Sequence, residues 1–249
     1  MTNFSANLGF LWTDLSLPDA IRAAKRAGFV AVECHWPFDT PAEDVKAALD
    51  ETGLPMLGLN TTRGDVGAGD NGLSAIPGRE IEARAAIDQA VAYARAIGAG
   101  CVHVMAGFAQ GPEAEACFVA NLAYACAEAP ELTMLIEPLN RHDAPGYFIE
   151  TTGHAKRIID KVGASNLKLM FDCYHVGRTE GDLLTRLMAL GDLVGHIQFA
   201  SVPDRGAPDH GEINYPWLFK EIEALGWKTP LGAEYKPGKA TGETLGWLG

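Results

Sequence analysis

The sequence predicts a single α/β domain of the (β/α)8, or TIM-barrel, class. The chain has 249 residues, 47% of them hydrophobic and 21% charged, which is enough to build one large buried core. Short β-rich runs alternate with Ala-rich segments of helical period along the whole chain. Eight such runs occur, whereas an open doubly wound sheet usually has about five or six strands. No linker or change in composition divides residues 1–249, so we expect one domain.

The predicted strands are rich in β-branched and aromatic residues and are bounded by Gly, Pro or polar residues. They cover residues 4–10, 29–34, 55–60, 101–105, 133–137, 167–172, 194–199 and 231–234. Helical segments separate them, and right-handed crossovers through such helices join strands in parallel order. The strands therefore predict a closed parallel barrel rather than a sandwich.

The predicted helices begin near Pro and end at Gly, the usual asymmetry of helix ends. The first has Pro18 near its start and Gly28 at its end, and the second lies between Pro41 and Gly53. Further helices are predicted at residues 79–97, 112–129, 152–162, 181–190 and 215–225, with a short one at 243–248.

Three connections are longer than the topology requires: residues 61–78, 138–151 and 200–214. They follow predicted strands, so we expect them to build the functional site at the carboxyl ends of the barrel. The first contains Gly67, Gly69 and Gly72 in the G-x-G-x-x-G pattern of dinucleotide sites. Because no helix opens directly on this run, we interpret it as a mobile lid.

Charge and cysteine content narrow the class of protein. The formal charge of -12 disfavours a nucleic-acid partner, since it repels a phosphate backbone. The five cysteines are odd in number and form no C-x-x-C pair, which favours reduced thiols in a cytoplasm. The sequence shows no export signal and no apolar run of about 18 residues, so we expect no membrane partner. A small-molecule substrate is expected, and a homo-oligomer remains open.

Polar oxygen donors stand at four consecutive predicted strand ends: Glu137, Asp172, Gln198 and Glu234. Neighbouring strands lie about 5 Å apart, so these side chains can converge at one point of the barrel mouth. Three carboxylates that close repel one another unless a cation lies among them. Oxygen ligands without Cys or paired His favour Mg²⁺ or Mn²⁺ over Zn²⁺.

Each of these side chains also has a structural interpretation. Asp172 could cap the following helix, Gln198 could be a satisfied polar group of the core, and the two Glu could pair with Lys or Arg. Any one of these interpretations is reasonable alone. The coincidence of all four at the same strand position favours a shared metal site.

Several motifs resemble the hydroxypyruvate isomerase family, which belongs to the xylose isomerase-like TIM barrels. They are IEPLNRHDAPGYF, DCYHVGRTEGDL, GHIQFASVPDRGAPDHGEINY and AEYKP, which occur in the family's order and spacing. The resemblance extends to AGFVAVECHWPFD, IPGREIEARAAIDQAV and LGWL, and so spans nearly the whole chain.

The resemblance implies a reaction and a set of site residues. The four strand-end side chains would be the metal ligands, with Glu137 and Glu234 as the catalytic pair. The implied reaction interconverts a 2-hydroxyaldehyde and a hydroxyketone through an enediolate, with hydroxypyruvate and tartronate semialdehyde as the family's couple; close relatives act on four-carbon 2-oxo acid sugars. His175 would bind substrate.

Four further residues are candidates at the barrel mouth. Arg205, in the seventh loop, could pair with a substrate carboxylate, the alternative being a solvated surface side chain. His103, on the fourth strand, is a second candidate for substrate binding. Glu33 and His35, after the second strand, are weaker candidates of the same kind.

Two loops depart from the family pattern. Residues 60–65 read NTTRGD where typical members have a sequence like NLPPGD, and residues 203–208 read PDRGAP where PGRHEP is common. Both loops are expected to face the substrate, so these changes concern the choice of substrate rather than the metal or the proton chemistry.

Three alternative functions remain. A ketose 3-epimerase on the same barrel usually has His where this chain has Gln198. A nuclease of the endonuclease IV kind would need a His-rich zinc site and a basic face, whereas this chain has seven scattered His and a charge of -12. A non-catalytic sugar-binding barrel would leave three converging carboxylates without a use.

Overall fold

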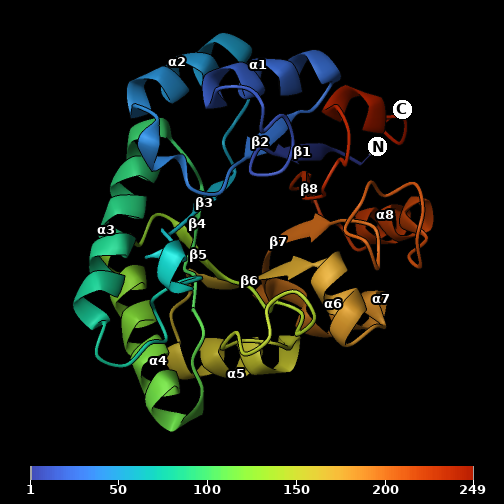
Figure 1. Cartoon of the computed structure of the whole chain (residues 1–249). Coiled ribbons are helices and arrows are strands. Elements are labelled where there is room, and N and C mark those ends of the chain that lie inside the picture. Colours follow the sequence, from blue (N-terminus) through green and yellow to red (C-terminus); the bar gives the residue numbers. More distant parts are fainter. Residues whose placement is uncertain (1, 249) are drawn as a thin grey trace.

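Eight parallel strands form a nearly closed barrel with helices around it, as the computed structural model of residues 2–248 shows (Figure 1). The strands are β1 (Phe4–Asn7), β2 (Ala31–Glu33), β3 (Gly58–Asn60), β4 (Cys101–His103), β5 (Thr133–Ile136), β6 (Leu167–Asp172), β7 (Val194–Phe199) and β8 (Leu231–Ala233). Their hydrogen-bonded order is β2-β1-β8-β7-β6-β5-β4-β3. The predicted fold class is therefore confirmed.

The barrel closes between β2 and β3 through a short contact. Val32 forms a parallel bridge with Met56, just before β3, and the backbone N–H of Leu57 donates to the Val32 carbonyl at 2.7 Å. Val32, Leu59 and Val102 are almost completely buried. They alternate along their strands with the lumen-facing Glu33, Asn60 and His103, so they pack toward the surrounding helices. The lumen itself holds hydrogen-bonded polar side chains such as Ser5, Glu33 and His196, and the functional site is expected at its carboxyl end.

Helices surround the barrel in the expected order. They are α1 (Leu17–Ala27), α2 (Ala42–Thr52), α3 (Glu80–Ile97), α4 (Gly111–Glu128), α5 (Thr152–Val162), α6 (Cys173–Thr179), α7 (Leu183–Leu190) and α8 (Tyr215–Ala224). The chain packs α1 to α5 along β1 to β5, one helix after each strand (Figure 1). Among the described residues no helix is long and apolar enough to cross a membrane.

Three of the predicted boundaries are wrong for identifiable reasons. The first strand ends at Asn7 rather than residue 10, because the N–H groups of Phe10 and Leu11 turn back to the Asn7 carbonyl. The single helix expected at 181–190 is preceded by α6, which begins directly after Asp172 because that side chain caps it. Such local capping is hard to see when a strand and a helix share a boundary.

The helix expected at 243–248 is replaced by a 3-10 turn at Thr241–Thr244 and a closing turn. The C-terminal segment lies near β1 and β8 (Figure 1), and Trp247 of this segment packs against the core. Its ring makes edge contacts with Phe4, Phe199 and Tyr235, at centroid distances of 5.1, 5.4 and 6.2 Å. One indole thus covers the apolar surface that a helix would otherwise cover.

The long loop after β3 folds against the end of β4. Gly72 bridges to Ala106 and has φ +109, and a Cβ there would lie 2.7 Å from the Met105 backbone. Arg79 pairs with Asp70 across this loop at 2.8 Å. Gly67 lies in a 3-10 turn, Val66–Ala68, and no α-helix opens on the glycine run, so the dinucleotide pattern has no structural counterpart here. The motion of this loop as a lid stays a prediction.

We expect Trp247→Ala to lower the free energy of unfolding by about 3 kcal/mol, because it removes the indole that packs on the Phe4 and Phe199 rings and leaves a cavity there. Urea unfolding followed by circular dichroism measures this. Trp217→Ala, on the half-exposed face of α8, is the matched control and should change stability by less than about 0.5 kcal/mol. Equal losses in the two variants would show that Trp247 does not substitute for a helix.

Candidate active site

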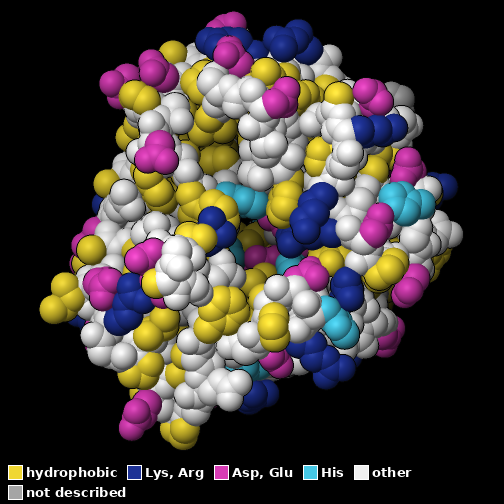
Figure 2. Space-filling model, in the orientation of Figure 1, with side chains coloured by type: hydrophobic (Ala, Val, Ile, Leu, Met, Phe, Trp, Pro, Cys, Tyr) yellow, Lys and Arg dark blue, Asp and Glu magenta, His cyan; other side chains and the backbone are white. Residues whose placement is uncertain are grey.

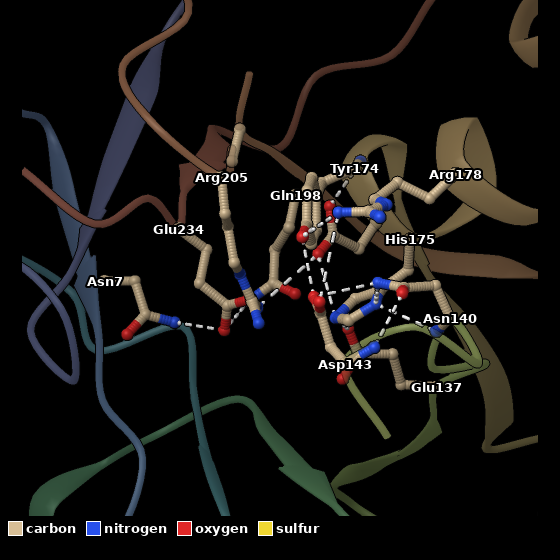
Figure 3. A network of polar contacts seen from close by, with 12 residues as sticks. Asn7, Glu137, Asn140, Asp143, Tyr174, His175, Arg178, Gln198, Arg205 and Glu234 are labelled. Carbon is tan, nitrogen blue, oxygen red and sulfur yellow. Dashed lines mark hydrogen bonds and ion pairs between the residues drawn. The ribbon is translucent and has the colours of Figure 1, made fainter. Parts of the chain in front are cut away.

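The four strand-end side chains converge at the carboxyl end of the barrel, as predicted. Glu137 follows β5, Asp172 ends β6, Gln198 lies near the end of β7 and Glu234 follows β8. Glu137, Asp172, Glu234 and His175 each offer an atom that lies within 4.8 Å of the others, and all four side chains are buried. Figure 3 shows Glu137, His175, Gln198, Arg205 and Glu234 around this point.

Asp172 divides its two oxygens between structure and site. Its Oδ1 accepts the N–H of Tyr174 at 2.8 Å and caps α6. Its Oδ2 is buried, has no hydrogen-bond partner and lies 3.6 Å from His175 Nε2. The helix-cap interpretation is therefore correct for one oxygen and leaves the other available to a ligand.

Glu137 has an oxygen without any hydrogen bond. Its Oε1 is buried and unpartnered, 3.9 Å from His175 Nε2, and its Oε2 lies 3.7 Å from His103 Nδ1. Burial, together with the charges of Glu234 and Asp172, raises the pKa of Glu137 well above its usual value. The pKa of Asp172 rises to about 7 because of burial and the charge of Glu234. Without a cation, these carboxylates do not all ionise together.

Glu234 is the carboxylate that the protein keeps ionised. Its Oε1 accepts from Asn7 Nδ2 at 2.9 Å and from His35 Nε2 at 3.0 Å, and its Oε2 forms an ion pair with Arg205 (Figure 3). Burial alone would raise the pKa of Glu234, but Arg205 and His35 lower it to about 2. The predicted alternative, that a Glu pairs with Arg, is thus realised at Glu234.

Arg205 lies inside the site rather than on the surface, so the solvated interpretation is wrong. Its side chain is 14% exposed, and its guanidinium carbon lies 4.7 Å from the ring centre of Phe10 and 5.1 Å from that of Tyr174. One guanidinium nitrogen pairs with Glu234 and lies 3.8 Å from Asp172 Oδ2. Burial lowers the pKa of Arg205, but the surrounding carboxylates raise it further, so it stays charged.

Gln198 presents an unpaired oxygen to the same point. Its Nε2 donates to Glu33 Oε2 at 2.7 Å and to Glu234 Oε1 at 3.3 Å. Its Oε1 is buried without a hydrogen bond. The interpretation of Gln198 as a satisfied core residue therefore holds for its nitrogen and not for its oxygen.

His175 is set as a hydrogen-bond donor toward the site. Its Nδ1 accepts the backbone N–H of Asn140 at 3.0 Å, so the neutral ring carries its hydrogen on Nε2, which faces Asp172 and Glu137. Burial and the charge of Arg205 lower the pKa of His175 to about 3, so the ring is neutral. In this tautomer Nε2 carries a hydrogen, so it can donate a hydrogen bond and cannot ligate a metal.

His103 is placed beside Glu137, yet neither of its ring nitrogens has a hydrogen-bond partner. Burial lowers the pKa of His103 to about 4, so it too is neutral. A buried ring with both nitrogens unpaired is rare in proteins and is ready to accept a ligand's hydrogen bond.

Three buried oxygens without hydrogen bonds therefore face one point: Glu137 Oε1, Asp172 Oδ2 and Gln198 Oε1. A buried oxygen left unpaired is costly, and a cation relieves this cost for all three at once. The donors are all oxygens, which matches the preference of Mg²⁺ and Mn²⁺. The residues present thus fit the divalent ion that the sequence predicts.

A cavity of about 170 Å³ opens at the site, where Glu137, His175, Arg205 and Glu234 line it. Its wall includes Phe10, Trp36, Asn60, Asn71 and Leu139 beside the polar site residues. Figure 2 shows a hollow in this face with acidic and histidine side chains in its depth and Lys or Arg side chains at its rim. This space suits a molecule of a few carbon atoms.

Sequence reasoning missed part of the polar surroundings. Asn7 and Asn140 orient Glu234 and His175, and His196 pairs with Glu33 at 3.0 Å inside the barrel. Asn7 ends β1, a signal that could have found it, whereas Glu33, which ends β2, was already a candidate from the sequence. The description of the histidines as scattered is wrong, since four of the seven gather here: His35, His103, His175 and His196.

Comparison with known proteins agrees with this geometry. Residues 21–249 match the model of a family described as xylose isomerase-like TIM barrel. A 2-oxo-tetronate isomerase of Cupriavidus necator is 42% identical over 100% of this chain and 98% of its own. A putative hydroxypyruvate isomerase of Homo sapiens is 41% identical over 98% of this chain and 93% of its own.

Solved structures share the same barrel. The structure of an AP endonuclease, family 2, from Brucella melitensis has a TM-score of 0.96 and 36% identity, over 100% of this chain and 98% of that one. The structure of a 3-keto-D-glucoside 4-epimerase from E. coli has a TM-score of 0.81, over 100% and 98%, but at 22% identity it shares the fold alone.

The full-length relatives are named as isomerases of small acids, and this chain is an isomerase of that kind, an intramolecular oxidoreductase. It belongs to the hydroxypyruvate isomerase family of xylose isomerase-like TIM barrels.

Proposed function

We propose that this enzyme interconverts hydroxypyruvate and tartronate semialdehyde, or a closely related small 2-oxo acid such as a 2-oxo-tetronate, with the help of Mg²⁺ or Mn²⁺. The observation that carries the proposal is the gathering of Glu137, Asp172 and Glu234 within 4.8 Å, with Glu137 Oε1 and Asp172 Oδ2 buried and unpartnered, beside a small cavity that Glu137 and Glu234 line. The names of the 36–42% identical relatives support the substrate class.

The proposed ligands of the ion are Glu137, Asp172, Gln198 and Glu234. When bound, a divalent ion would supply Lewis-acid stabilisation of negative charge on two adjacent substrate oxygens. It would also balance the like charges that now raise the pKa of Glu137 and Asp172. For Glu234 to serve as a ligand, Arg205 must release one carboxylate oxygen.

The reaction itself moves one carbon-bound proton. A base removes a proton from carbon 3 of hydroxypyruvate, which leaves an enediolate spread over two carbons and two oxygens. Return of a proton to carbon 2, with transfer of the hydroxyl hydrogen from oxygen 3 to oxygen 2, gives tartronate semialdehyde. No electrons leave the substrate, so no redox cofactor is required.

The two glutamates differ in their fitness as the base. Glu137 has an oxygen free of hydrogen bonds, and burial and its neighbours raise its pKa, so once a cation lets it ionise it is the stronger base of the two. Glu234 is stabilised as an anion by Asn7, His35 and Arg205. We therefore assign the first proton abstraction to Glu137, while Glu234 faces the substrate from β8 and completes the catalytic pair.

Three neighbouring side chains are proposed to bind the substrate. His175 Nε2–H can donate to a substrate oxygen, since its tautomer is fixed by Asn140. His103, neutral and unpartnered, can take a second substrate group. Arg205 can bind the carboxylate of the acid once it turns from Glu234, because its Nε is buried and unpaired.

The site does not favour the nuclease alternative. Of the four gathered histidines, His35 and His196 donate to carboxylates and His175 is bound by Asn140, so only His103 keeps both nitrogens free. Gln198 stands where an epimerase usually has His, which favours isomerisation over epimerisation.

Removal of divalent ions with EDTA is expected to abolish conversion of hydroxypyruvate, because the three carboxylates then repel one another and the enediolate. Activity should return on addition of Mg²⁺ or Mn²⁺ and not of Na⁺. A coupled assay for tartronate semialdehyde measures this. Full activity of the stripped protein would remove the ion from the mechanism.

Replacement of the proposed catalytic carboxylates should stop turnover while leaving the fold intact. Glu137→Gln and Glu234→Gln are each expected to lower kcat by at least about 100-fold, the usual contribution of a positioned acid or base. Glu131→Gln, on the surface beside Arg95, is the matched control and should keep the wild-type rate. Near-native kcat in both site variants would exclude their catalytic role.

Turnover in deuterated water distinguishes proton transfer from hydride shift. We expect deuterium at carbon 2 of tartronate semialdehyde, because a carboxylate that carries the proton exchanges it with solvent. Mass spectrometry of the trapped product detects the label. A product free of label over many turnovers would favour direct hydride movement instead.

A further inference from the structure

We propose that Glu33 is a positioning residue. It fixes the orientation of the Gln198 side-chain amide, so that Gln198 Oε1 faces the proposed metal ligands. This inference rests on the proposed function, because it assigns a cause to the geometry of one proposed ligand. Glu33 is not among the residues that line the cavity, and its hydrogen bond to a proposed metal ligand is the one to Gln198.

Glu33 lies below the site, at the end of β2 and inside the barrel. It is 4% exposed, and each of its oxygens is engaged. Its Oε1 accepts from Ser5 Oγ at 2.8 Å, and its Oε2 accepts from His196 Nε2 at 3.0 Å and from Gln198 Nε2 at 2.7 Å. The bond to Gln198 is the shortest of the three.

A carboxylate can only accept hydrogen bonds, so it decides which end of an amide faces it. Glu33 lies on one side of Gln198, and Glu234 Oε1 lies 3.3 Å from the same nitrogen. With two acceptors around one end, the NH₂ group must occupy that end. The carbonyl Oε1 of Gln198 is then left on the other side of the amide, where it is buried without a hydrogen-bond partner.

A glycine on β8 leaves the space that the Glu33 carboxylate occupies. Gly232 on β8 pairs in register with both Ser5 of β1 and Gln198 of β7. A Cβ at position 232 would lie 2.2 Å from Glu33 Oε1 and 2.8 Å from the Gln198 Cγ. Only glycine leaves room for the pair, which indicates a built arrangement rather than incidental contact.

A purely structural role for Glu33 would rest on its ion pair with His196. His196 Nε2 lies 3.0 Å from Glu33 Oε2. Burial lowers the pKa of His196, but Glu33 raises it above its usual value, so Glu33 stabilises the charged form of this ring. Buried pairs are weak sources of stability, however, and a partner for His196 does not need a third bond to Gln198. The two roles differ in what they predict for metal affinity.

Two substitutions of Glu33 distinguish an effect of its side-chain length from an effect of its negative charge. Glu33→Gln keeps the length of the side chain and one acceptor oxygen, and its new NH₂ can donate to the Ser5 hydroxyl. Glu33→Asp keeps the charge but draws the carboxylate away from Gln198 by about one bond length. Positioning predicts that only the Asp variant is impaired, whereas an effect of charge predicts the reverse.

The readout is the Kd for Mn²⁺ of the metal-stripped protein, measured from the electron paramagnetic resonance signal of free Mn²⁺. We expect Glu33→Asp to raise this Kd by about 10- to 100-fold, the usual effect of losing a partner that orients a ligand. Glu33→Gln should stay within about threefold of wild type. Ser5→Ala, which removes a bond on the far side of Glu33, is the matched control and should also stay there.

A double-mutant cycle excludes indirect effects on the fold. In a Gln198→Leu background, Glu33→Asp should cause no further loss of Mn²⁺ affinity, because the group that Glu33 orients is gone. Persistence of the full loss in that background would overturn the proposal, as would a Glu33→Gln variant as weak as Glu33→Asp. If Glu33→Asp does not fold, Gly232→Ala displaces the same carboxylate and should weaken binding likewise.

The test also separates this inference from the proposed function. A wild-type protein that binds no Mn²⁺ at all would contradict both the proposed metal-dependent function and the positioning role of Glu33. A wild-type protein that binds Mn²⁺, beside a Glu33→Asp variant that binds it equally well, would sink the role of Glu33 alone.

Discussion

The crowding of three buried carboxylates at one end of the barrel is the constraint on which the site depends. Glu137, Asp172 and Glu234 have reacting atoms within 4.8 Å of one another. The guanidinium of Arg205 lies close to these carboxylates and forms its ion pair with Glu234. Burial and the remaining charge raise the pKa of Glu137 and of Asp172, a cost that the proposed cation would relieve.

The barrel makes this crowding possible because parallel strands end at the same edge. Neighbouring strands β5 to β8 are held in register by their ladders, so side chains at equivalent strand ends have no freedom to separate. The energy that stabilises the barrel comes from elsewhere, from the apolar layer between the strands and the helices and from the aromatic packing around Trp247. A strained, charged site is tolerated because it is supported by a large apolar core.

A second layer of polar residues sets how the first layer is oriented. Asn140 fixes the tautomer of His175, Asn7 and His35 hold Glu234, and Glu33 meets the amide of Gln198. Each makes a directional hydrogen bond to a group that could otherwise rotate. Orientation of this kind matters for chemistry because a ligand or donor acts only when the correct atom faces the substrate.

The sequence by itself determined the barrel class and the four strand-end oxygen donors, because strand alternation, helix caps and the position of a residue at a strand end are local properties. Only the tertiary structure decided that Arg205 is buried against Glu234, that four separate histidines gather, and that Trp247 replaces a last helix. These facts depend on contacts between residues far apart in the chain. Local patterns carry no record of such contacts.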